Sequence, residues 1–152
     1  MSYKLRIERQ IISMIKVLFV CHGNICRSPM AEYILKSLDD SIKVESRATS
    51  TEEIGNDIYP NTKEELKKHN IAFERHYAKQ ITIDDYNSFD LIVCFDDYNI
   101  KNLKRLINDD KKVIKLLDKD IDDPWYTRDF EKAYSEIYDG CIRLLAKIKR
   151  RN

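Results

Sequence analysis

The sequence predicts an α/β fold, a parallel β-sheet with helices on both faces in a three-layer, doubly wound arrangement. Short apolar runs rich in β-branched residues alternate along the chain with longer amphipathic segments. This alternation is typical of parallel strands joined by right-handed crossovers, whose helices then cover both faces of the sheet. The chain has 152 residues, without a linker or an internal repeat in the sequence, which predicts one domain.

Four segments have the pattern of strands, either wholly apolar or alternating between apolar and polar residues. They cover residues 16–20, 42–46, 91–95 and 113–117. Three helices are predicted between them. Ser28 followed by Pro29 is a cap signal for the first, residues 60–69 are rich in helix formers, and Asp96 caps the third. The last helix carries the clearest apolar stripe, formed by Phe130, Tyr134, Ile137, Cys141, Leu144, Leu145 and Ile148.

Composition excludes several classes of protein. The formal net charge is +1, so no strong overall field attracts nucleic acid or an anionic membrane. No apolar run is long enough to cross a bilayer, and four cysteines are too few for a disulfide-stapled secreted domain. We expect a cytoplasmic protein that is a monomer or a weak dimer. Residues 1–13 do not resemble a signal peptide; we expect a loosely ordered extension there and the domain over residues 14–152.

The loop after the first strand carries the chemistry. In a parallel sheet, ligands bind outside the carboxyl ends of the strands, where this loop lies. Its amides, ahead of a helix N-terminus, can form an anion-binding nest, and Gly23 is expected to adopt the unusual backbone angles of the tight turn. Arg27 can bind two oxygens of a phosphate. The predicted phosphate-binding residues are Cys21, His22, Gly23, Asn24, Ile25, Cys26, Arg27 and Ser28.

The same positive surroundings favour the thiolate form of Cys21, which makes its sulfur a nucleophile toward a bound phosphate. The Ser28 hydroxyl is close enough in sequence to hydrogen-bond this sulfur. The alternative interpretation, a buried structural cysteine with a surface arginine, does not explain why both flank a strand–loop–helix junction. Cys26 could form a reversible disulfide with Cys21 under oxidants, or be a small packed side chain. Cys94 and Cys141 are predicted to lie in the core, and no spacing of Cys or His suggests a zinc site.

Residues 17–32, with the sequence VLFVCHGNICRSPMAE, resemble the signature of the low-molecular-weight protein tyrosine phosphatases. The resemblance extends from about Met14 onward and includes SRATS at residues 46–50, IGN at 54–56 and DPWY at 123–126. It implies a four-stranded parallel sheet and hydrolysis of phosphotyrosine and small aryl phosphates, without a cofactor or a metal. The implied partners are a phosphotyrosine protein or peptide and phosphate or another tetrahedral anion.

The resemblance also assigns roles to residues that the chemistry alone leaves open. A phenolate leaving group needs a proton donor, for which Asp118, Asp120, Asp122 and Asp123 are all candidates. Similarity to the family's Asp-Pro pair selects Asp123. Matching the family implies that Asn24, Ser46 and His76 support the loop, although His76 alone could be an ordinary surface or packed histidine. It also implies that Trp125 and Tyr126 form an aromatic wall, although both could simply pack in the core.

Two departures from the family pattern stand out. Glu52 occupies a rim position that is commonly aromatic, so we expect a more polar rim that disfavours acidic phosphopeptides. His22 stands where leucine is frequent, and the sequence gives it no role. Among rival functions, an arginine phosphatase would carry threonine in place of Ile25. A thioredoxin-coupled arsenate reductase would need cysteines within residues 70–87, which contain none. The intact set of Cys21, Arg27 and Asp123 argues against a non-catalytic phosphate binder.

Overall fold

The computed structural model describes residues 15–150, so the extension predicted for residues 1–13 lies outside the described part of the chain. In chain order the strands are β1 (Lys16–Cys21), β2 (Lys43–Ala48), β3 (Leu91–Cys94) and β4 (Val113–Lys115). The helices are α2 (Arg27–Leu38), α3 (Pro60–Lys68), α4 (Ile83–Ser88), α5 (Asp97–Ile107), α6 (Pro124–Thr127) and α7 (Phe130–Arg150). No helix within residues 15–150 is long and apolar enough to cross a membrane.

The four strands form one parallel sheet in the order β2-β1-β3-β4, which confirms the predicted fold. β1 is central, and its registers pair Cys21 with Ala48 of β2 and Phe19 with Val93 of β3. Because β1 and β3 have neighbours on both sides and helices above and below, their side chains are buried throughout their apolar runs.

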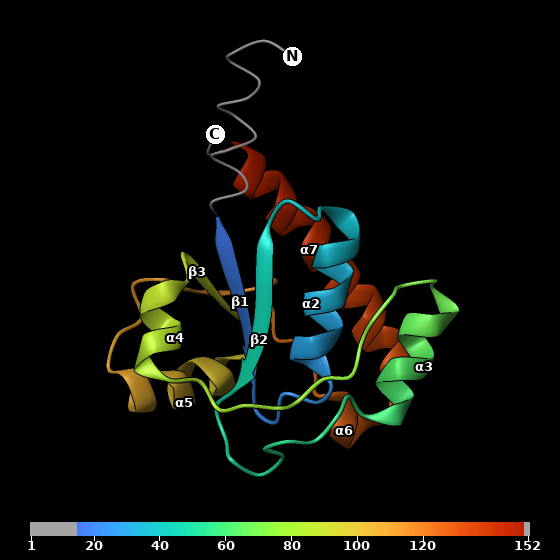
Figure 1. Ribbon diagram of the computed structural model, residues 1–152, viewed down its shortest axis with the longest axis horizontal. Helices are drawn as coiled ribbons and strands as arrows, with labels where there is room; N and C mark the ends of the chain where they lie inside the picture. Colours follow the sequence, from blue (N-terminus) through green and yellow to red (C-terminus); the bar gives the residue numbers. More distant parts are fainter. Residues whose placement is uncertain (1–14, 151–152) are drawn as a thin grey trace.

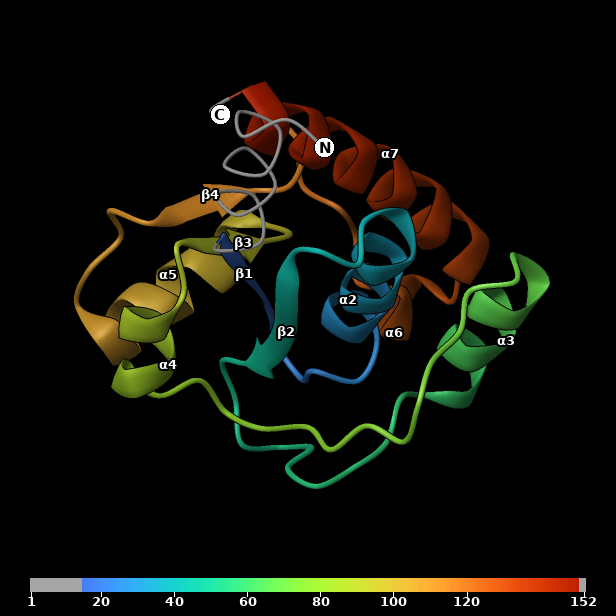
Figure 2. The same ribbon diagram turned by 45° about the horizontal axis from the view of Figure 1, so that its top comes forward.

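Each face of the sheet packs on its own helices (Figures 1 and 2). Val17, Phe19 and Val93 face the apolar sides of α2 and α7, where the predicted stripe of α7 is buried. Leu18 and Ile92 point the other way, into a smaller cluster with α4 and α5. Since alternate residues of a strand face opposite sides, these two cores follow directly from the sequence of the central strands.

The sheet order places the loop after β1 at a topological switch point. The chain leaves β1, forms β2 on one side, and returns through α3 and α4 to form β3 on the other side. The crossovers therefore diverge at the carboxyl end of β1, and residues 22–26 lie in the resulting crevice. This is the position in which open α/β sheets bind ligands.

Some local predictions were wrong. α2 begins at Arg27 with Cys26 as its N-cap residue, so Ser28 is not the cap, and its hydroxyl is used elsewhere. β2 begins one residue later and ends two residues later than expected, because residues 47 and 48 still pair with β1. The short helices α4 and α6 were not predicted, since each has too few turns to show an apolar stripe.

Candidate active site

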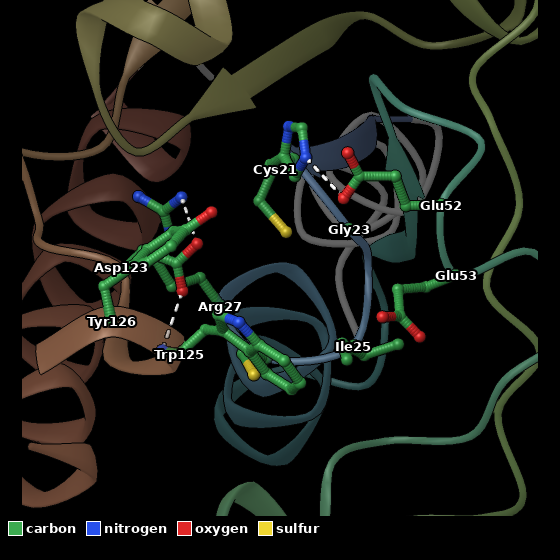
Figure 3. Close-up of a pocket in the computed structure, with 11 residues that line it drawn as sticks. Cys21, Gly23, Ile25, Arg27, Glu52, Glu53, Asp123, Trp125 and Tyr126 are labelled. Carbon is green, nitrogen blue, oxygen red and sulfur yellow. Dashed lines mark hydrogen bonds and ion pairs between the residues drawn. The ribbon is translucent and has the colours of Figure 1, made fainter. Parts of the chain in front are cut away.

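A pocket of about 410 Å³, including its open mouth, lies at the carboxyl end of β1. Figure 3 shows the sulfur of Cys21 facing into it, with Asp123 on one side and Glu52 and Glu53 on the other. The lining residues come from the loop after β1, the segment after β2 and the segment that enters α6. They are Cys21, His22, Gly23, Ile25, Cys26, Arg27, Glu52, Glu53, Asp123, Trp125 and Tyr126.

The tight turn of the loop is formed by Asn24 and not by Gly23. Asn24 has a φ of 60° in the left-handed region, whereas Gly55 is the glycine with positive φ among residues 15–150. The expectation that Gly23 adopts the unusual backbone angles of the turn was therefore wrong, although Gly23 lines the pocket. Asparagine tolerates this conformation better than most residues because its short polar side chain can hydrogen-bond nearby groups. The side chain of Asn24 does so here, as it is fully buried within the supporting network.

Cys21 ends β1 and is 3% exposed. Its sulfur lies 3.0 Å from the Ser28 hydroxyl and accepts a hydrogen bond from the amide of Asn24 at 3.3 Å. Both groups can donate to a sulfur anion, and the first turn of α2 adds the positive end of its dipole. The arrangement suits a thiolate held at the floor of an anion-binding loop.

A chain of hydrogen bonds behind the loop sets the direction in which Ser28 donates. Ser46 donates to the Glu32 carboxylate at 2.6 Å, so its oxygen is free to accept from Asn24 Nδ2 at 3.0 Å. The same Nδ2 donates to Ser28 Oγ at 2.8 Å. With its oxygen accepting from Asn24, the Ser28 hydroxyl has its proton available for the sulfur of Cys21. Glu32, which is 7% exposed, is thus a supporting residue that the sequence analysis missed.

His76 supports the loop from the opposite side. Its Nε2 lies 2.7 Å from the carbonyl oxygen of Asn24, and since a carbonyl can only accept, this nitrogen carries the proton. Burial lowers the pKa of His76 below its usual 6.5, although the bond to Asn24 and the charges of Glu32 and Asp57 oppose that shift. The neutral, Nε2-protonated ring is therefore the form that holds the loop at neutral pH.

Arg27 is 2% exposed, and two hydrogen bonds from one nitrogen of its guanidinium group fix the orientation of that group. Nη1 donates to Asp96 at 2.7 Å and to the carbonyl oxygen of Ile121 at 2.8 Å. Burial tends to lower the pKa of Arg27, but the charges of Cys21, Asp123 and Asp96 raise it above its ordinary value. Nε has no hydrogen-bond partner among the described residues, whereas Nη2 makes a long hydrogen bond to Asp123 at 3.4 Å and keeps a second N–H. Nε and this second N–H can bind two oxygens of an anion.

Of the four aspartates considered as proton donors, Asp123 is the one that lines the pocket. It is the N-cap residue of α6: Oδ1 accepts from the amide of Trp125 at 3.0 Å, and Oδ2 lies 3.4 Å from Arg27 Nη2. Asp120 instead pairs with Lys115 at 2.9 Å, and Asp122 with Lys132 at 3.6 Å. Of these four side chains, Asp123 is therefore the one placed beside Cys21 and Arg27 in the pocket.

The rim combines aromatic and acidic side chains. Trp125 and Tyr126 are 42% and 76% exposed, which places them on the pocket wall and not in the core. Glu52 stands on the opposite side, and His22 Nε2 lies 3.0 Å from its carboxylate. The sequence did not suggest this contact between His22 and Glu52.

The remaining cysteines differ from Cys21 in their surroundings. Burial, followed by the charges of Cys21 and Asp123, raises the pKa of Cys26 to about 12. Burial also raises the pKa of Cys94 and of Cys141 well above the usual range, and both lie in the core as predicted. All four cysteines are free, so the Cys21–Cys26 disulfide stays a prediction. Residues 15–150 contain no group of three or more His, Cys, Asp or Glu side chains suited to a metal ion.

Comparison with known proteins agrees with this geometry. Residues 16–152 match the family described as low molecular weight phosphotyrosine protein phosphatase. The chain belongs to this family. It is 38% identical over 152 residues to the low molecular weight protein-tyrosine-phosphatase YfkJ of Bacillus subtilis, a match that covers 90% of this chain and 97% of that protein. The predicted family and enzyme class are therefore confirmed.

Two solved structures share the fold, one of them that of a low molecular weight protein tyrosine phosphatase. The crystal structure of SP-PTP from Streptococcus pyogenes has a TM-score of 0.85 and 45% sequence identity, covering 88% of this chain and 93% of that one. Wzb of Vibrio vulnificus, solved in complex with benzylphosphonate, has a TM-score of 0.83 and 28% identity, covering 88% and 99%. These relatives support protein-tyrosine-phosphatase activity for the chain.

Proposed function

We propose that the pocket hydrolyses phosphotyrosine in cytoplasmic proteins or peptides, and small aryl phosphates, through a cysteinyl-phosphate intermediate. The observation that carries the proposal is the convergence of the Cys21 sulfur, the Nε edge of the Arg27 guanidinium and the Asp123 carboxyl group on one pocket. A nucleophile, an anion-binding fork and a proton donor are the groups that hydrolysis of a phosphate ester through a covalent intermediate requires.

In the first step, Arg27 and the loop amides hold the phosphoryl oxygens while the Cys21 thiolate attacks phosphorus. The bond from phosphorus to the phenolic oxygen breaks, and protonated Asp123 gives its proton to that oxygen. Charge on the transferring phosphoryl group is spread over oxygens that face the loop amides, so stabilisation there contributes most to the rate.

In the second step, the Asp123 carboxylate accepts a proton from water as the water oxygen attacks phosphorus. The sulfur–phosphorus bond breaks, and the Ser28 hydroxyl stabilises the departing thiolate by donating to it at the 3.0 Å separation. Phosphate then leaves, and Asp123 is protonated again for the next cycle.

The walls of the pocket favour an aryl ester. The nucleophile Cys21 is 3% exposed and lies at the floor of the pocket. The ring of Trp125 is exposed on the wall of the same pocket. A phenyl ring can rest on this wall while its phosphate reaches the loop, whereas a phosphoserine ester is too short to use both. The benzylphosphonate bound by Wzb has the same combination of a ring and a tetrahedral anion. Ile25, apolar and 7% exposed, offers no polar group to a guanidinium, which argues against a phosphoarginine substrate.

The test is a comparison of phosphotyrosine, phosphoserine and phosphoarginine peptides without added metal. We expect turnover of phosphotyrosine to dominate. Cys21→Ser should abolish turnover yet still bind phosphate, and Asp123→Asn should slow release of phenol severely. Asp122→Asn is the matched control, because this neighbouring carboxylate is exposed and lies outside the pocket. Preferred hydrolysis of phosphoarginine, or full activity of Cys21→Ser, would overturn the proposal.

A further inference from the structure

Arg128, directly after α6, has an unusual backbone conformation for an arginine. Its φ of 63° and ψ of 15° lie in the left-handed region, and its amide donates to the carbonyl oxygen of Pro124 at 2.9 Å. A residue other than glycine keeps such a conformation where surrounding contacts hold it. Because Asp123 caps the other end of the same single turn, whatever fixes Arg128 also limits the movement of the Asp123 carboxyl group.

The side chain of Arg128 is held by Tyr59, the residue that precedes α3. Nη2 donates to the Tyr59 hydroxyl at 2.9 Å, and the guanidinium carbon lies 5.2 Å from the centre of the Tyr59 ring and 5.3 Å from that of Phe130. The Tyr59 ring also packs edge-on against Trp125, with 5.0 Å between ring centres. Tyr59 thus contacts α6 through its ring and Arg128 through its hydroxyl.

Tyr59 is joined to the phosphate-binding loop by its backbone. Its amide donates to the carbonyl oxygen of Ile25 at 2.9 Å, and its ring packs on a small apolar cluster that contains Ile25, Cys26 and Phe130. One residue therefore connects the loop that carries the nucleophile with the turn that carries Asp123. Figure 1 shows α6 next to the N-terminal end of α3, the helix that Tyr59 precedes.

We propose that Tyr59 and Arg128 are positioning residues, which hold the Asp123 turn at a fixed distance from the phosphate-binding loop. The proposal rests on the function proposed above, in which the Asp123 proton passes to the leaving phenolic oxygen. A small misplacement of a reacting group lowers the rate steeply, so loss of these contacts weakens protonation of the leaving group. Attack by Cys21 and binding by Arg27 should be affected much less. The Cys21 sulfur is held by Ser28 and Asn24, and the short bonds of Arg27 go to Asp96 and Ile121, all of which lie outside α6.

The dependence of the rate on the leaving group tests this assignment. Phenyl phosphate has a basic leaving group that needs the proton, whereas the leaving group of p-nitrophenyl phosphate is acidic enough to need it much less. For Arg128→Gly we expect kcat/KM for phenyl phosphate to fall about 10-fold and that for p-nitrophenyl phosphate less than 3-fold. Glycine suits the left-handed conformation, so this variant removes the guanidinium without adding backbone strain. Tyr59→Phe, which removes the hydroxyl and keeps the ring, should give a smaller loss with the same selectivity.

Two further measurements separate positioning from a general structural role. In an Asp123→Asn background, Arg128→Gly should cause no additional loss, because the group it positions is already gone. Arg143→Gln, on α7 and paired with Asp139, is a matched control that should leave both substrates unaffected. Equal losses on both phosphates, or a further loss in the Asp123→Asn background, would overturn the proposal. If Asp123→Asn itself shows no dependence on the leaving group, the proposed function is wrong, and this inference with it.

Discussion

Replacing Ser46 by alanine removes two links from the hydrogen-bond chain behind the phosphate-binding loop. Ser46 is 3% exposed, donates to Glu32 at 2.6 Å and accepts from Asn24 at 3.0 Å. A neutral buried hydrogen bond contributes about 1 kcal/mol and one to a charged group about 1.5–3 kcal/mol. Glu32 keeps its contact with Lys36 at 2.6 Å, which places the loss toward the lower end of the sum. We therefore expect Ser46→Ala to reduce the free energy of unfolding by about 3 kcal/mol.

Denaturation by urea, followed by fluorescence, measures this loss as a lower midpoint with an unchanged slope. Glu32→Gln and the double variant complete a thermodynamic cycle, in which we expect a coupling of at least about 1 kcal/mol between the two positions. Ser135→Ala, on the exposed side of α7, is the control and should change the stability by less than about 0.5 kcal/mol. A loss below about 1 kcal/mol for Ser46→Ala, or strict additivity with Glu32→Gln, would refute the reasoning.

Three further predictions concern pH, thiol reactivity and packing. Burial lowers the pKa of His76 in the folded protein below 6.5, the ordinary value that it has in the unfolded chain. The contribution of neutral His76 to stability is therefore complete above pH 6.5 and is lost as the pH falls toward the pKa of the folded protein. Urea titrations should show this loss in the wild type and a smaller one in His76→Gln; identical pH profiles would contradict it. At neutral pH, iodoacetamide should label Cys21 first and spare Cys26, because the pKa of Cys26 is raised to about 12. Peptide mass spectrometry measures the order of labelling, and alkylation of Cys26 before Cys21 would disprove the prediction. A Cβ at Gly140 would lie 2.5 Å from Leu116 Cγ, so Gly140→Ala should lower the free energy of unfolding by about 1–3 kcal/mol, whereas a rise in thermal midpoint would show that the helix accommodates it.

The sequence predicts best where one physical pattern dominates. The apolar runs of β1 and β3 can only be buried strands, and the stripe on α7 extends over enough turns to be unmistakable. α4 could not be found in this way, because its six residues bury a single side chain, Tyr86. Its N-terminus is held by a capping box between Thr82 and Asp85, a signal that could have located it.

The residues that line the candidate pocket were more predictable than the residues that hold them in place. Cys21 and Arg27 stand out because a strand, a loop and a helix meet around them. Glu32 and Asp96 could not be identified, since a carboxylate in a helix or at a helix cap is most often exposed, and their partners lie 14 and 69 residues away. The Ser-Pro pair predicts a helix cap at Ser28, whereas Ser28 is the second residue of α2 and its hydroxyl contacts the Cys21 sulfur.

The proposed mechanism requires the phosphoryl group to be bonded to the Cys21 sulfur after it leaves the phenolic oxygen and before it is transferred to water. The most direct test is rapid acid quenching of the enzyme during turnover of p-nitrophenyl phosphate, followed by peptide mass spectrometry. We predict one added phosphoryl group, located on Cys21 and absent from the Cys21→Ser variant. A phosphoryl group on any other residue would contradict this mechanism. Release of p-nitrophenol during the first turnover, with no phosphorylated enzyme formed, would contradict it as well.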